Sequence, residues 1–417
     1  MHLPIFTASD PHLMRSDAGR DPLGILPVWS ELGRKLVPNI AGPVAQLEGI
    51  TAVLLIHYLY EKSGAAKDAK RGTFRQYFRL MEGVLEWYLW DIPGGKRHCY
   101  GTKALSAGGE FTVTAKDTRT AVNGLYQYYR GTCNRAELLL DGVIAPAVAK
   151  AFDAAWTIEA SEVLRPALRF CLNDANNPLT PKILIKRDGA LYKALAKAFA
   201  SAPLTALLHE RLFGEGRYRA LSAYCSQLLK ADEKVFQALG RDLYLVRQLG
   251  AMLTDEDPAA SLQSRLAHIE QCEPFLITVQ DSFDLLRSQP GGTITQVAKT
   301  LDKYANVIRQ RAAQFRKLED IATNERSREM QTVAAAAFNG VPDFLRAILT
   351  HHASVASDRG RDPIALLEGE KIVAPTAPDR SQQKIVERLG NGYPWDNGYY
   401  LATAGRLYQQ VQEAQHV

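Results

Sequence analysis

The stretch NGLYQYYRGTCNRAELLLDGVIAPAVAKAF, residues 123–152, decides the fold. It begins with a helical pattern that we expect to continue to about Glu137. Two short apolar runs then flank Asp141-Gly142, a dipeptide favoured in tight β-hairpins. Pro146 suits the first turn of a following helix. Because a helix, a small hairpin and a second helix follow in this order, the sequence predicts a winged-helix-like module.

The length of 417 residues indicates two or three domains. Helical patterns dominate from Glu159 onward, and the segment IALLEGEKIV at residues 364–373 predicts a second small hairpin. We therefore expect a mainly α protein with an N-terminal winged-helix-like domain followed by a helical bundle with small β-hairpins. The expected domains are residues 1–158, an arm plus the winged-helix-like domain, and residues 159–417, a helical C-terminal domain.

The chain carries no expected membrane span. Its most apolar segment, GITAVLLIHYLY, has 12 residues, whereas a spanning helix needs about 20. We interpret it as a buried helix. The five cysteines are odd in number and form no C-x-x-C pair, which opposes a disulfide framework and a four-thiolate zinc site. The first 20 residues lack the pattern of a signal peptide. The sequence therefore predicts a cytoplasmic protein.

Positive charge is concentrated in one part of the chain. The formal net charge is +5. Residues 61–150 contain fourteen Lys or Arg and nine Asp or Glu residues, an excess of five positive charges. Such a local excess is compatible with binding to double-stranded DNA, although an excess of this size also arises by chance.

The helix before the hairpin is a candidate recognition helix, because a winged helix places this helix in the major groove and the hairpin beside it. Arg and Lys bind phosphates, while Arg, Asn and Gln also contact base edges. The tyrosines of residues 126–129 cannot all face a core, so at least one should be exposed. The basic loop at residues 94–103 could also contact the phosphate backbone. The expected DNA contacts are Lys96, Arg97, Lys116, Arg119, Gln127, Tyr129, Arg130, Asn134 and Arg135. The alternative is that the module contacts protein and not DNA.

No motif of a known catalytic centre is present in the sequence. It lacks H-E-x-x-H, G-x-S-x-G, a phosphate loop and a dinucleotide-binding glycine pattern. We therefore expect no catalytic residue, no cofactor and no metal site. A degenerate nuclease core stays open as an alternative, because residues 160–186 contain a Glu, an Asp and lysines near an apolar run. His352 lies on the apolar face of its predicted helix, which favours a buried core histidine.

A second element of interest is predicted from Thr293 to about Ile321. Thr293 and Gln296 form a capping-box pattern at its start. Apolar residues then recur in a heptad pattern, so another helix must cover this seam. If a partner protein covers it, the interface consists of Ile294, Val297, Leu301, Tyr304 and Ile308. We favour cover by helices of the same chain, because Tyr304 and Phe315 suit a mixed core better than a two-stranded seam.

Three stretches together resemble a group of bacterial proteins encoded in anti-phage defence gene clusters. They are RDPLGILPVWSELGRKLVPNI, GLYQYYRGTCNRAELLLDGVIAP and FLRAILTHHASVASDRGRDPIALLEGEKIV. The matching residues are Asp21, Pro22, Leu23, Gly24, Tyr128, Tyr129, Gly131, Arg359 and Gly360. The resemblance implies a non-catalytic subunit that acts beside an ATPase or a nuclease.

The sequence thus predicts an accessory or sensor subunit of a defence complex that contacts DNA, partner proteins or both. Two alternatives come from other classes: a divergent metal-dependent nuclease and a purely structural scaffold.

Overall fold

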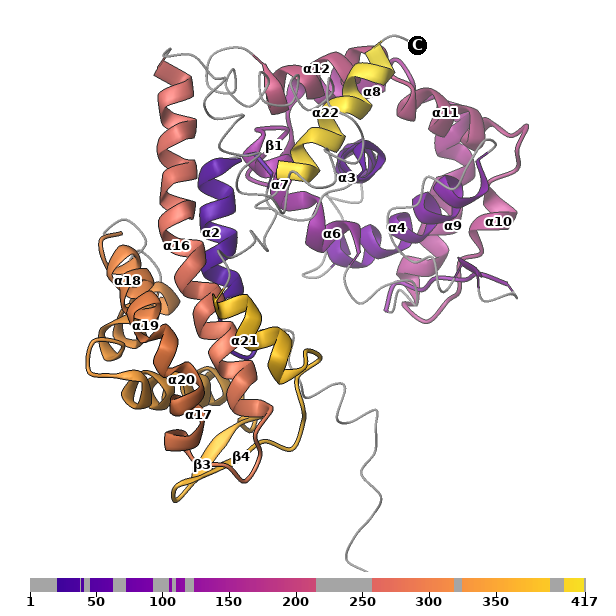
Figure 1. Ribbon diagram of the computed structural model, residues 1–417. Coiled ribbons are helices and arrows are strands. Elements are labelled where there is room, and N and C mark those ends of the chain that lie inside the picture. Colours follow the sequence, from indigo (N-terminus) through magenta and orange to yellow (C-terminus); the bar gives the residue numbers. More distant parts are fainter. Residues whose placement is uncertain are drawn as a thin grey trace, which may run out of the picture. The chain divides into compact units, whose positions relative to one another are not determined.

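The computed structural model describes residues 21–37, 39–40, 46–62, 73–92, 105–106, 110–116, 124–214, 257–318, 325–390 and 401–415. Helices dominate this part of the chain, and its strands pair as two antiparallel hairpins, β1–β2 and β3–β4 (Figure 1). The predicted mainly α class is confirmed. No helix within these ranges is both long and apolar enough to cross a membrane.

The chain divides into two compact units. Unit 1 consists of residues 1–36, 239–251 and 260–399, and unit 2 of residues 37–238, 252–259 and 400–417. The predicted domain boundary after residue 158 falls inside unit 2, because α9 (Ile158–Asn173) packs against α4 (Thr73–Asp91) from the other side of that boundary.

Unit 1 is a helical bundle that carries one hairpin. Its elements are α2 (Leu26–Leu36), α16 (Asp257–Arg287, of which the part from residue 260 belongs here), α17 (Ile294–Leu301), η1 (Asp302–Tyr304), α18 (Ala305–Arg316), α19 (Glu325–Ala336), α20 (Val341–Asp358), β3 (Leu366–Glu368), β4 (Lys371–Val373) and α21 (Gln382–Gly390). Phe275, Phe315 and Phe344 meet in its core, with the Phe275 and Phe315 ring centroids 4.9 Å apart. The predicted hairpin at residues 364–373 is confirmed as β3–β4.

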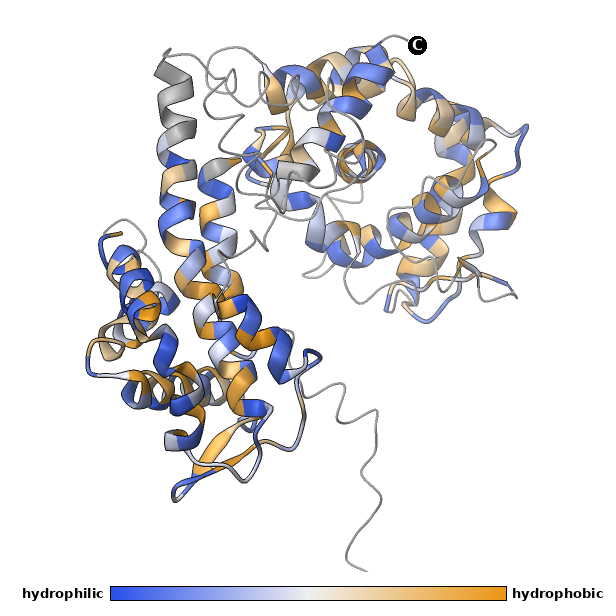
Figure 2. Cartoon of the chain, viewed as in Figure 1, coloured by the Kyte–Doolittle hydropathy of each residue, from blue (hydrophilic) through white to orange (hydrophobic). Residues whose placement is uncertain are grey.

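Unit 2 is built around α3 (Leu47–Lys62), whose residues 49–59 are all buried. Figure 2 shows that α3 is hydrophobic around its circumference, as the buried-helix interpretation predicts. The other elements are α4, α6 (Leu125–Tyr128), α7 (Arg130–Arg135), β1 (Leu139–Leu140), β2 (Val143–Ile144), α8 (Pro146–Asp153), α9, α10 (Pro181–Leu184), α11 (Ala190–Phe199), α12 (Ala202–Phe213) and α22 (Leu401–Gln415).

The hairpin predicted around Asp141-Gly142 is confirmed. Leu139 pairs with Ile144, and Leu140 pairs with Val143. Asp141 has a φ of 51° and Gly142 a φ of 84°. Both central residues are therefore left-handed, as tight hairpin turns of this kind require, and this explains the Asp-Gly pair.

The helix before the hairpin differs from the prediction. A turn at Tyr129 divides it into α6 and α7, and the ring of Tyr129 points into the core of the unit. Residues 117–123, where we expect the start of this helix, lie outside the described part of the chain.

The continuous helix predicted from Thr293 to about Ile321 is wrong. The capping box of Thr293 and Gln296 is present, but α17 ends at Leu301 and the 3-10 turn η1 separates it from α18. The turn allows α17 to pack on α20 while α18 packs on α19, which a straight helix with one seam does not.

The partner interface expected on this segment is also corrected. Four of its residues are at most 2% exposed: Ile294, Val297, Leu301 and Ile308. Tyr304 is half-buried and lies against Gly390 of α21. Helices of the same chain therefore cover the seam. Arg311, the one polar interruption of the pattern, is buried and donates to the Thr278 Oγ1 atom at 2.9 Å.

Candidate functional site

Two arginines converge on one tyrosine in unit 2. The guanidinium carbon of Arg75, on α4, lies 3.9 Å from the ring centroid of Tyr126, on α6. The guanidinium carbon of Arg130, on α7, lies 5.1 Å from the same centroid. Phe78 packs edge-on against Tyr126, with the centroids 5.0 Å apart. Cation–π attraction therefore holds two positive charges at one place. We call Arg75, Tyr126 and Arg130 the arginine–tyrosine cluster.

The charge of this cluster is not neutralised by an ion pair within the described ranges. Arg75 Nη1 and Arg130 Nε are buried there without a hydrogen-bond acceptor. Glu82, on the same helix as Arg75, interacts electrostatically with Arg75 and receives hydrogen bonds from the backbone N–H groups of Leu125 and Tyr126. Burial raises the pKa of Glu82, although Arg75 and these hydrogen bonds act in the opposite direction. Two guanidinium groups held on one ring, without an ion pair in the described part of the chain, form a positive site that suits an anion.

His57 adds no charge to the cluster. It is buried between Phe74 and Phe78, with centroid distances of 4.8 and 6.3 Å. Burial and the nearby charge of Arg130 lower the pKa of His57 to about 4. The imidazole is therefore neutral at physiological pH, and its role is to pack.

The β1–β2 hairpin lies next to the cluster. A side chain at Gly142 would meet the Arg130 Nη2 atom at 3.2 Å, so Arg130 sits against the hairpin turn. The backbone N–H of Ile144 donates to the Glu61 Oε1 atom at 2.8 Å, which ties the hairpin to α3. Leu140 and Val143 are 51% and 55% exposed beside the turn. The hairpin thus offers an apolar, solvent-facing edge next to two arginines.

The residues predicted from the sequence to contact DNA differ in their exposure. Lys116, Gln127, Asn134 and Arg135 are exposed, and Arg130 is half-buried in the cluster. Lys96, Arg97 and Arg119 lie outside the described residues.

Tyr129 is a correction to this set. It is 1% exposed, and a side chain at Gly49 of α3 would lie 2.3 Å from its ring. Tyr129 is therefore a core residue and makes no contact with a ligand.

The sequence analysis missed Arg75 and Arg79. Both lie on α4, in the aromatic stretch FRQYFRLMEGVLEWYLW, for which the sequence predicts a helix and no site residue. Arg79 donates to the carbonyl oxygens of Ala115 (3.3 Å) and Lys116 (2.8 Å), so it fixes the exposed Lys116 next to α4. Their spacing of four residues, which places both on one helix face, was the available signal.

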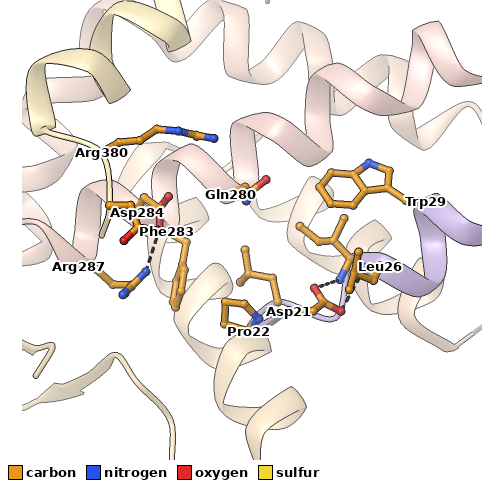
Figure 3. A pocket seen from close by; sticks show the side chains of 12 residues that line it. Asp21, Pro22, Leu26, Trp29, Gln280, Phe283, Asp284, Arg287 and Arg380 are labelled. Atoms are coloured by element: carbon orange, nitrogen blue, oxygen red, sulfur yellow. Dashed lines mark hydrogen bonds and ion pairs between the residues drawn. The ribbon is translucent and has the colours of Figure 1, made fainter. Parts of the chain in front are cut away.

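Unit 1 contains a cavity of about 230 Å³ between α2 and α16 (Figure 3). Its lining residues are Asp21, Pro22, Leu23, Ile25, Leu26, Trp29, Gln280, Phe283, Asp284, Arg287, Asp379 and Arg380. Its principal charges are already engaged within unit 1. Asp284 pairs with Arg287 at 3.1 Å, and Asp21 accepts from the backbone N–H groups of Ile25 and Leu26. Arg380 pairs with the buried carboxylate of Asp281.

This cavity does not have the composition of a metal centre. Among the residues that the structure places, no three His, Cys, Asp or Glu side chains come together in an arrangement that could hold a metal ion. The acids of the cavity stabilise the start of α2 and the contact of residues 376–380 with α16. We therefore do not assign the cavity to the nuclease alternative.

His352 is a core histidine, as predicted. Its Nδ1 lies 2.8 Å from the Pro22 carbonyl oxygen, and its Nε2 accepts from the Ile364 N–H at 2.9 Å. An accepting Nε2 requires the proton to be on Nδ1, so the ring is neutral. The histidine thus joins the backbones of Pro22 and Ile364.

Comparisons with protein-family models, with curated proteins and with solved structures found no match for this chain.

Proposed function

We propose that this chain is a non-catalytic protein that binds the phosphate backbone of double-stranded DNA on unit 2. The observation that supports it is the arginine–tyrosine cluster, in which Arg75 and Arg130 share one ring and have no carboxylate partner within ion-pair distance in the described part of the chain. Guanidinium groups match the geometry of phosphate oxygens, and their planar faces stack on aromatic rings.

The elements around the cluster favour a duplex over a free phosphate. Gln127 and Asn134 are exposed on α6 and α7 and can contact base edges, while Arg135 can contact phosphates. The β1–β2 hairpin, whose turn lies next to Arg130 of α7, supports docking in which the hairpin acts as a wing. A winged-helix-like mode of docking is part of the proposal.

The wider role that we propose is that of an accessory or sensor subunit in a bacterial anti-phage defence complex. The support is the resemblance of the three sequence stretches, which implies an ATPase or nuclease partner. A cytoplasmic location belongs to the same proposal. It agrees with Cys133, Cys171 and Cys272, which are free buried thiols.

The test is the binding of a fluorescent 20-base-pair duplex measured by anisotropy over a range of salt concentrations. The wild-type protein should bind with an affinity that falls steeply with salt, because phosphate contacts release counterions. Arg75→Ala together with Arg130→Ala should weaken binding about 10- to 100-fold and reduce the slope of log K against log salt by about 2.

A matched control removes the same charge elsewhere. Arg328 and Arg361 are exposed in unit 1, and replacing both by Ala should leave the affinity within about twofold. A wild-type protein that binds no duplex at low salt contradicts the proposal and supports the scaffold alternative. Magnesium-dependent cleavage of the duplex by the wild-type protein contradicts the non-catalytic assignment and supports the nuclease alternative.

A further inference from the structure

The helix α9 in unit 2 has an apolar stripe on its exposed face. Val163 and Phe170 are 40% and 58% exposed, and Pro166 between them is exposed as well. Their spacing of three and four residues places them on one line along the helix. The opposite face of α9 is buried against α4 and α11, so the stripe is additional to the core contacts of this helix.

Charged residues flank this stripe in an ordered way. Glu162 and Arg169 are both exposed and are seven residues apart, so they lie on the same side of the stripe at different heights. Seven residues correspond to about 10 Å along a helix, so the two side chains do not neutralise each other. At the edge of the stripe, an acidic side chain therefore lies toward the N-terminus and a basic one toward the C-terminus, while the exposed Arg165 lies farther round the helix, at the pocket that Tyr77 and Trp156 line.

We propose that α9 is a homodimerisation surface that pairs antiparallel with α9 of a second copy of this chain. In an antiparallel helix pair, residues on the same flank face each other across the interface. Glu162 of one copy then meets Arg169 of the other, and the two-fold axis repeats the pair.

The apolar residues fit the same register. When Glu162 and Arg169 are level across the interface, Pro166 lies next to the two-fold axis. Phe170 then packs beside Val163 of the second copy, where an aromatic side chain covers a β-branched one. Three apolar side chains and one repeated charge pair make a small interface, so we expect a weak dimer with a Kd on the order of 10 µM.

The test measures the mass of the full-length chain by sedimentation equilibrium from about 1 to 300 µM, a range that brackets that Kd. The monomer mass is 46.1 kDa, and the wild-type protein should approach twice this value as concentration rises. Phe170→Lys should raise the Kd at least about tenfold. Phe338→Lys is the matched control, because Phe338 is also an exposed aromatic residue but lies in unit 1. The dimerisation Kd of this variant should equal that of the wild type.

Charge exchange provides the specific arm of the test. Glu162→Arg alone and Arg169→Glu alone each place like charges across the interface, so each should raise the Kd several-fold. The double variant Glu162→Arg, Arg169→Glu should restore the wild-type Kd. A mixture of the two single variants should also associate, because each Arg of one chain then faces a Glu of the other.

Three results would overturn the proposal. They are a wild-type chain that stays monomeric over the whole range, a Phe170→Lys variant with the wild-type Kd, and a charge exchange that restores neither the double variant nor the mixture. Circular dichroism of each variant should give the wild-type spectrum, because the substituted side chains are exposed.

Discussion

Tyr129 is buried because Gly49 leaves room for its ring. A methyl group at residue 49 would lie 2.3 to 2.7 Å from three ring carbons of Tyr129, which is well inside van der Waals contact. This close contact between Gly49 and Tyr129 decides which of the three tyrosines at residues 126–129 faces the core. Tyr126 faces the two arginines instead. The sequence could predict that the three rings do not all point inward. It could not predict which one does, because the deciding glycine is 80 residues away.

Gly49→Ala should therefore destabilise the protein by about 2 kcal/mol, although Ala favours a helix over Gly by about 1 kcal/mol. In a Tyr129→Leu background, the same substitution should be neutral or stabilising, because the ring that it meets is gone. Urea denaturation of the four proteins in this double-mutant cycle measures the coupling. If Gly49→Ala costs the same in both backgrounds, the close contact is not the cause.

His57 makes a second prediction at this scale. Its pKa is lowered from 6.5 to about 4, so the folded state binds the proton less readily than the unfolded state. The contribution of neutral His57 to the free energy of unfolding is therefore fully present above pH 6.5 and is lost as pH falls toward 4. Because His57 is buried, its protonation should lower the free energy of unfolding by about 2 kcal/mol between pH 7 and pH 5.

The measurement compares the unfolding free energy of the wild-type protein and His57→Gln at pH 7 and pH 5. The variant should lose about 2 kcal/mol less than the wild type on acidification, because glutamine does not titrate. The buried His351 and His352 are present in both proteins, so their contribution cancels. An equal loss in both proteins would show that His57 accepts a proton in the fold without cost.

At the scale of elements, the segment that follows Thr293 shows how far a periodic pattern can mislead. Its apolar spacing is consistent with one long helix, yet η1 interrupts it after Leu301. The heptad positions within α17 and α18 are buried as predicted, because each helix keeps its own apolar side inward, whereas Tyr304 in η1 is half-buried. What the pattern does not contain is the direction of each neighbouring helix, and that direction determines where the chain must turn.

The capping box is a local feature that the sequence predicted correctly, and its contribution can be measured. The Thr293 Oγ1 atom accepts from the Gln296 N–H, and the Gln296 side chain accepts from the Thr293 N–H. Thr293→Ala should cost about 1 kcal/mol in urea denaturation. Thr295→Ala, an exposed threonine two residues later, should stay within about 0.5 kcal/mol of the wild type. Equal effects of the two variants would mean that the cap contributes no stability of its own.

Ile308 tests the cover of the same segment. It is 2% exposed on α18, so Ile308→Asp places a carboxylate in the core of unit 1 and should cost about 3 kcal/mol or more. Asn306→Asp, at an exposed position of the same helix, is the control and should melt with the wild type. An unchanged melting temperature of Ile308→Asp would show that the neighbouring helices do not exclude water from this position.

At the scale of the whole molecule, the sequence predicted the helical class and both hairpins, because these depend on local patterns. It did not predict the division of the chain. The last helix, α22, belongs to unit 2, where the Leu47 N–H donates to the Gln410 side chain at 2.6 Å. Nothing local in residues 401–415 specifies a return to α3 and α12. The arginine–tyrosine cluster was missed for the same reason, since α4 and α6 meet across 50 residues of sequence.

We propose that Arg75 and Arg130 bind phosphate through planar groups fixed on Tyr126, and not through charge alone. The most direct test replaces both by lysine, which keeps the net charge of +5. Duplex affinity at constant salt is then compared with that of the wild type and of the control Arg328→Lys, Arg361→Lys. We expect the Arg75→Lys, Arg130→Lys protein to bind the duplex about tenfold more weakly than the wild type, because lysine cannot stack or bind bidentately. The affinity of the control should not change. If the Arg75→Lys, Arg130→Lys protein binds the duplex as tightly as the wild type, phosphate binding through planar guanidinium groups is contradicted.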